Sequence, residues 1–211
     1  MALPQDIAAF AESIVNTLTQ TVYQHVDHID PQSGVYGCDC NGFAAFVLRA
    51  AALKNFAAIP IDTQPDSVES RPRAFEYYDY FASLPSESTG GWSRVDLLTD
   101  AGRGDILAWR FPTIEPGVDT GHVVILAETP RLDASGEFYV VRVYDSAAEA
   151  HFEDTRMPDR KPSPKGQTGV GSGFLNFRLD GLGRPIAYLF APPSTGQYSY
   201  RPIAIGRAKP I

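Results

Sequence analysis

The chain has 211 residues, which is long enough for one domain with a sizeable hydrophobic core. Hydrophobic residues make up 44% of it and charged residues 20%, the composition of an ordinary globular protein. The 18 basic and 25 acidic side chains give a net charge of −7, and no cluster of Lys or Arg interrupts this balance. We therefore expect no nucleic-acid partner, because phosphate binding needs a basic surface.

Targeting signals are not evident in the sequence. No apolar run approaches the roughly 20 residues that cross a bilayer, so we expect no membrane span. The first residues, MALPQD, lack the basic start and apolar core of a signal peptide, which predicts a cytoplasmic protein unless a leader has been removed. Cys38 and Cys40 are too few and too close for a disulfide scaffold, and the oligomeric state stays open.

The first half of the chain predicts helices. Apolar residues recur at three- and four-residue steps over residues 5–24, the period of an amphipathic helix. Residues 26–37 lack such a period and contain Pro and Gly, which predicts a loop. Residues 40–55 are apolar nearly all round and predict a buried helix, and a further short, aromatic-rich helix is expected over 73–84. Its aromatic rings either pack in the core or line a cleft.

The second half predicts strands, because short β-branched and aromatic runs alternate with Gly, Pro and Asp. Five such runs form an antiparallel meander in this interpretation: residues 105–110, 122–127, 138–145, 173–179 and 185–190. A last run at 203–205 is expected at the edge of the sheet. Between Asp145 and Gly173 lies a long loop, in which Asp154 and Arg156 are expected to form a local ion pair.

Helices followed by strands predict an α+β fold in a single domain over residues 1–211. In this prediction the core spans about 5–190, and residues 191–211 form a C-terminal tail.

A candidate nucleophile stands at the start of the buried helix. Cys40 at a helix N-terminus faces unpaired N–H groups and the positive end of the helix dipole, which lower a thiol pKa and can stabilise an oxyanion. Asp39 or Asn41 could cap this helix, and Gly42 could leave room for a substrate. The alternative is that Cys40 is a small buried apolar residue.

Two further residues could complete a catalytic set. His122 opens the second predicted strand and could act as the base for Cys40, as thiol acyl transfer requires. Asp145 ends the next strand, where a carboxylate could orient the His122 ring. Taken singly, a partly buried histidine and a turn aspartate are the simpler explanations.

The order of these residues resembles the NlpC-type cell-wall peptidases and amidases of the papain-like cysteine hydrolases. The matching segments read DCNGF at 39–43, GDILAW at 104–109 and GHVVI at 121–125, within a region of about half the chain. Asn41 stands where the family usually has serine, and the family's third residue is often His or Asn rather than Asp.

The resemblance implies a papain-like fold, with N-terminal helices packed on a C-terminal meander sheet. It implies a Cys40–His122–Asp145 triad that cleaves an amide through a thioester, in a peptide or peptidoglycan fragment, with no cofactor and no metal. The backbone N–H of Cys40 and the Tyr36 hydroxyl would stabilise the oxyanion, with Asp39 and Asn41 beside them.

Other residues carry weaker hypotheses. Trp92 and His151 could line the substrate cleft, although a core tryptophan and a solvated loop histidine are the simpler explanations. The spacing of the cysteines relative to His25 and His28 is not typical of a zinc site. Two other functions remain open, namely a catalytically silent peptide-binding module and a thiol acyltransferase or deamidase that uses the same triad.

Overall fold

The computed structural model describes residues 3–61, 71–115, 118–158, 161, 163–192 and 196–211. Helices dominate the first part of the chain and strands the second, so the structure has the predicted α+β organisation. The α-helices are α1 (Leu3–Thr17), α2 (Cys40–Ala51), α3 (Leu53–Ala57) and α4 (Ala74–Ser83). None of the helices in the described ranges is both long and apolar enough to cross a membrane.

The main sheet is antiparallel and holds nine strands. Eight follow the order β11-β10-β9-β8-β6-β5-β12-β4, and β7 pairs with β8 beside this path. The strands are β4 (Trp92–Val95), β5 (Ile106–Arg110), β6 (Gly121–Leu126), β7 (Arg131–Leu132), β8 (Tyr139–Ala147), β9 (Gly169–Leu179), β10 (Pro185–Leu189), β11 (Ser199–Tyr200) and β12 (Ile203–Ala208). The predicted meander is confirmed as β5, β6, β8, β9 and β10, each paired with the next.

The C-terminal segment differs from the prediction. Strand β12 is not at the edge but lies between β4 and β5, paired with both. Its central residues are buried, and the following Lys209 backbone bonds to Gly91. Residues 203–208 are thus an interior strand rather than part of a tail, because their apolar side chains complete both faces of the sheet.

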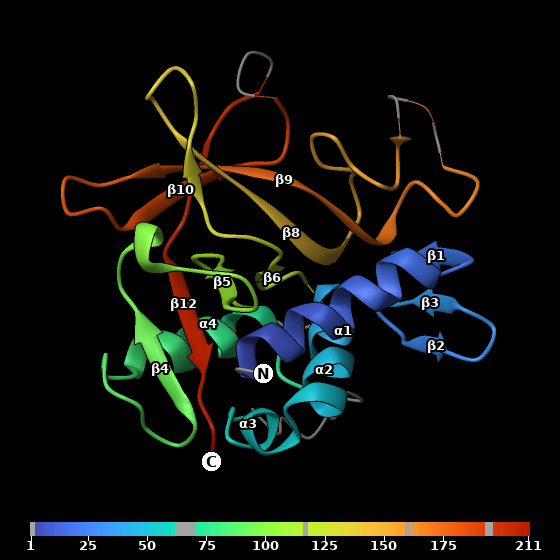
Figure 1. Cartoon of the computed structure of the whole chain (residues 1–211), viewed down its shortest axis with the longest axis horizontal. Helices are drawn as coiled ribbons and strands as arrows, with labels where there is room; N and C mark the ends of the chain where they lie inside the picture. Colours follow the sequence, from blue (N-terminus) through green and yellow to red (C-terminus); the bar gives the residue numbers. More distant parts are fainter. Residues whose placement is uncertain (1–2, 62–70, 116–117, 159–160, 162, 193–195) are drawn as a thin grey trace.

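The expected loop over 26–37 instead contributes to a second, three-stranded sheet. Strands β1 (Gln20–Val22) and β2 (His28–Asp30) flank β3 (Val35–Gly37), with β1 parallel and β2 antiparallel to it. Figure 1 shows this small sheet beyond the end of α1, away from the helices α3 and α4. It carries the chain directly to the start of α2.

The core has two parts, one on each face of the main sheet. The helices α1, α2 and α4 pack on one face, where their buried side chains form a single cluster with those of the sheet. On β6, Val123 and Ile125 join the helix-side cluster, whereas Val124 and Leu126 join the cluster on the opposite face. This period of two places alternate side chains of β6 in different environments.

Candidate active site

Helix α2 begins at Cys40 because Asp39 caps it. The Oδ1 atom of Asp39 accepts the N–H of Gly42 at 2.8 Å, which satisfies one of the unpaired donors of the first turn. The same carboxylate pairs with Arg71 at 2.9 Å, and both side chains are only 4% exposed. His25 lies 3.3 Å from its second oxygen. Asp39 therefore fixes the position of Cys40 rather than lining an open cleft.

The prediction that Gly42 leaves room for a substrate is wrong. A side chain at this position would collide with the Asp27 carboxylate and the Cys38 side chain. Gly42 instead permits the close packing of Asp27 against the start of the helix.

The Cys40 sulfur lies where β6 and β8 diverge. These strands pair only through Ile125 and Leu126 of β6, so the earlier residues of β6 have no partner on that side. There the backbone N–H of Val123 donates to the sulfur. The thiol in turn donates to Asn41 Oδ1 at 3.6 Å. The sulfur is thus held next to the backbone of the residue that follows His122.

Cys40 is a neutral, buried thiol in this structure. Only 2% of the residue is exposed, and burial raises the pKa of the thiol well above its usual value. The negative charge of Asp39 adds to this effect, while the N–H of Val123 opposes it. The expected lowering of the pKa by the helix N-terminus is therefore overcome by desolvation.

A network of buried polar side chains surrounds Asp145, near the end of β8. Its Oδ2 atom lies 2.7 Å from His122 Nε2 and 2.8 Å from His151 Nε2. Its Oδ1 atom accepts a hydrogen bond from Arg156 Nη2 at 2.9 Å. Arg156 also binds both oxygens of Asp154, so its planar fork joins the two carboxylates. The prediction of a local Asp154–Arg156 pair is confirmed, and the pair extends to Asp145.

Asp145 is ionised in this network. Complete burial alone would raise the pKa of its carboxyl group. His151, Arg156 and the hydrogen bond from His122 outweigh burial and hold the pKa well below its usual range. An ionised carboxylate only accepts hydrogen bonds, so His122 carries its proton on Nε2. Its Nδ1 atom is then the unprotonated nitrogen of the neutral ring.

Aromatic rings support both imidazoles from the face opposite the helices. The Trp109 ring lies 5.1 Å from the His122 ring, and Phe190 meets His122 edge-on at 5.8 Å. His151 stacks on Phe190 with centroids 4.6 Å apart and planes within 5°. These contacts restrict the rotation of both histidines.

Several predicted site residues lie elsewhere. Trp92 is fully buried, donates to the Asn55 carbonyl and packs on Phe81, so it is a core residue. The His151 side chain is also fully buried, which contradicts both a cleft contact and a solvated loop residue. Tyr36 is 4% exposed and packs edge-on against Phe46 in the helix-side core, rather than offering its hydroxyl in an open cleft.

Tyr23 is a site residue that sequence reasoning missed. It is half-buried after β1, and burial raises the pKa of its phenol, with further contributions from Cys40, Asp119 and Asp39. The Tyr23 ring also meets the His25 ring edge-on at 5.5 Å. A tyrosine preceding an irregular turn carries no local signal, and its distance from Cys40 in the sequence hides the contact.

Among the described residues, His122, Asp145 and His151 offer three potential metal-ligand atoms within 4.8 Å of one another. Both nitrogens, however, lie at hydrogen-bond distance from the same carboxylate oxygen, and Arg156 neutralises the other oxygen. A guanidinium beside the carboxylate disfavours a second cation there. We therefore interpret the group as a hydrogen-bonded network.

Comparisons with family models, with curated proteins and with solved structures found no match to this chain. The class of protein is therefore inferred from the geometry of its residues.

Proposed function

We propose that this protein is a papain-like cysteine hydrolase that cleaves an amide bond. The observation that carries the proposal is that the thiol at the start of a buried helix contacts the backbone of a strand residue whose preceding residue is an aspartate-bound histidine. Cys40 accepts the N–H of Val123, and the neighbouring His122 donates to Asp145. These contacts bring the thiol against the strand that carries the histidine and its carboxylate, which supports assigning Cys40 as nucleophile, His122 as base and Asp145 as the orienting group.

The reaction begins from neutral groups. The Cys40 sulfur attacks the substrate carbonyl while His122 Nδ1 takes the thiol proton, so thiolate exists only transiently. The C–N bond then breaks, and the protonated His122 gives its proton to the leaving amine. Water attacks the resulting thioester with His122 again as base, which releases a carboxylic acid and restores the thiol. Asp145 stabilises the imidazolium in both steps.

Asn41 is expected to regulate access to the sulfur. Its side chain is partly exposed, and its Oδ1 atom holds the thiol proton in the resting form. A bound amide would displace this contact and direct the S–H toward His122. The N–H groups at the start of α2, including that of Cys40, are the donors proposed for the oxyanion.

The resemblance to NlpC-type enzymes suggests a short peptide as the substrate, of the kind found in peptidoglycan stems. A peptide-binding module without turnover is a second candidate, favoured by the 2% exposure of Cys40 and its raised pKa. Transfer of the acyl group to an amine, instead of to water, is a variant of the first proposal.

A panel of short L- and D-peptides, analysed by mass spectrometry, tests the proposal. Turnover should be lost in Cys40→Ala and retained in Cys38→Ala, a matched control whose buried thiol has its pKa raised to about 12. Intact-mass analysis should detect an acyl group on Cys40 in the wild type, and added amine should divert it if transfer is favoured. Turnover by Cys40→Ala would refute the nucleophile. Binding without products in the wild type would support the binding module.

A further inference from the structure

The loop that follows β8 folds back onto Asp145. Its backbone is tied to neighbouring strands: Phe152 bonds to Phe174 of β9 and to Phe190, and the Thr155 N–H donates to the carbonyl of Ser172 at 2.8 Å. These bonds carry His151, Asp154 and Arg156 to the buried carboxylate, as their side-chain contacts require. The loop is therefore a built part of the site.

His151 reaches Asp145 from the loop that follows β8, and its side chain is completely buried. Its ring stacks on Phe190, and its backbone N–H donates to Asp154 at 2.7 Å. It therefore has no access to a substrate. Its Nε2 atom nonetheless reaches the same carboxylate oxygen as His122 Nε2, at nearly the same distance.

We propose that His151 is a positioning residue that sets the basicity of His122 by sharing the Oδ2 atom of Asp145. The proposal deepens the hydrolase function proposed above and rests on it for its catalytic meaning. Two N–H donors on one oxygen divide its negative charge, so the carboxylate holds each ring less strongly than it would hold one. Removal of one donor should therefore strengthen the hold of the carboxylate on the other ring.

The surroundings of Asp145 support this balance. The two buried carboxylates share one guanidinium, so the hydrogen bonds from the imidazoles are needed to complete the compensation of charge. The titratable and charged groups that interact electrostatically with Asp145 include His122, His151, Arg156, Cys40 and Tyr23. Asp154 is linked to it through the shared guanidinium of Arg156. Loss of the His151 donor leaves His122 as the single imidazole on Oδ2, which favours the imidazolium form.

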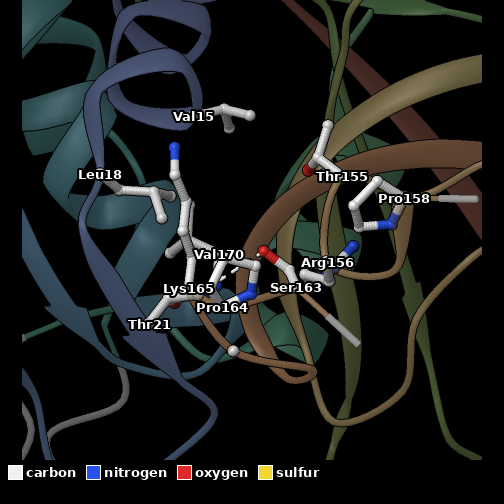
Figure 2. Close-up of a pocket in the computed structure, with 11 residues that line it drawn as sticks. Val15, Leu18, Thr21, Thr155, Arg156, Pro158, Ser163, Pro164, Lys165 and Val170 are labelled. Atoms are coloured by element: carbon white, nitrogen blue, oxygen red, sulfur yellow. Dashed lines mark hydrogen bonds between the residues drawn. The ribbon is translucent and has the colours of Figure 1, made fainter. Parts of the chain in front are cut away.

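A matched control lies in the same loop region. Arg156 and Lys165 both line a pocket of about 260 Å³. Figure 2 shows the Lys165 side chain extending past Leu18 toward Val15. Lys165 is not among the described hydrogen-bond or ion-pair partners of Asp145. Lys165→Gln should therefore leave the titration midpoint of the His122 ring unchanged.

The test is a ¹⁵N NMR titration of the four histidine rings in the wild type and in three variants. His151→Phe keeps the aromatic stack and removes the donor, whereas His151→Gln keeps an N–H near the Nε2 position. We expect the His122 midpoint to rise by about one pH unit in His151→Phe, and to stay near the wild-type value in His151→Gln and Lys165→Gln. A merely structural His151 would lower stability without moving this midpoint.

The wild-type spectrum gives a second test if His151→Phe does not fold. It should show His151 protonated on Nε2 in its neutral form, and protonation on Nδ1 alone would overturn the proposal. An unchanged His122 midpoint in folded His151→Phe would also overturn it. Absence of turnover across the peptide panel would instead refute the hydrolase function and leave the titration result standing.

Discussion

Replacement of Arg156 by methionine tests the energetics of the buried network. The guanidinium is 1% exposed and makes hydrogen bonds to Asp145, to both oxygens of Asp154 and to the Gly169 carbonyl at 2.6–2.9 Å. Methionine keeps most of the side-chain volume but leaves two buried carboxylates without their cation. Loss of one partner of a buried pair costs about 3–5 kcal/mol, a large share of the roughly 5–15 kcal/mol that stabilises a domain.

The loss should depend on pH. In the wild type the pKa of Asp145 is held well below its usual value, so its contribution is present above about pH 4 and is lost as pH falls through the folded-state pKa. Without Arg156, burial moves the pKa of this carboxyl group upward, and protonation then relieves the unpaired charge. The difference between variant and wild type should therefore be largest near neutral pH and should narrow below about pH 5.

Urea unfolding, followed through the fluorescence of the buried Trp92 and Trp109, measures both effects. Arg184→Met is the control, because Arg184 pairs with Asp180 at a similar 2.8 Å but is 56% exposed. Its removal should cause no measurable change. A loss below about 1 kcal/mol for Arg156→Met at neutral pH, or a loss independent of pH, would refute the account of the network.

Three further changes probe the elements that hold the site. Asp39→Ala should lower the free energy of unfolding by at least about 1–2 kcal/mol in urea titrations, because it removes the cap of α2 and the partner of the buried Arg71. The control Asp30→Ala, at an exposed position, should not cause a loss of this size. Gly121→Ala should cost about 1–3 kcal/mol by the same measurement, since φ is +143° and a side chain would meet a β5 carbonyl, whereas Gly181→Ala faces open space. Alkylation of Cys40 by iodoacetamide, followed by intact mass, should keep accelerating above about pH 8.5, the usual thiol pKa, and a plateau below it would contradict the buried neutral thiol.

The sequence predicted the parts of the fold that depend on local patterns. The strands of the meander are dense in β-branched and aromatic residues, and both faces of the sheet are buried, so each strand was recognisable. The strands β1, β2 and β3 were missed because each spans only three residues, too few to show a period. The helix predicted over residues 5–24 ends at Thr17, so β1 lies within that prediction, and β2 and β3 lie within the predicted loop. The position of β12 was missed because a strand's sequence does not specify its partners.

The same distinction applies to the site. Cys40, His122 and Asp145 stand at the ends of elements that the sequence predicted. The structure adds the contact between the Cys40 sulfur and Val123, the residue that follows His122 on β6. Arg156 and His151 lie in an irregular loop, where the sequence gives no sign of burial. Their contacts depend on the loop folding back onto β8 and β9, a tertiary arrangement without a local signature.

The cost of the buried charges is itself an argument about function. Arg71 with Asp39, and Arg156 with Asp145 and Asp154, are almost completely buried, whereas pairs such as Arg184 with Asp180 lie at the surface. Apolar residues of similar volume are often neutral or more stabilising than a buried ion pair. One of the two buried networks fixes the start of the helix that carries the thiol, and the other fixes the carboxylate on the histidine. Stability alone does not account for both networks meeting at these two elements, whereas the roles proposed for Cys40 as nucleophile and His122 as base would require both to be held in a fixed orientation.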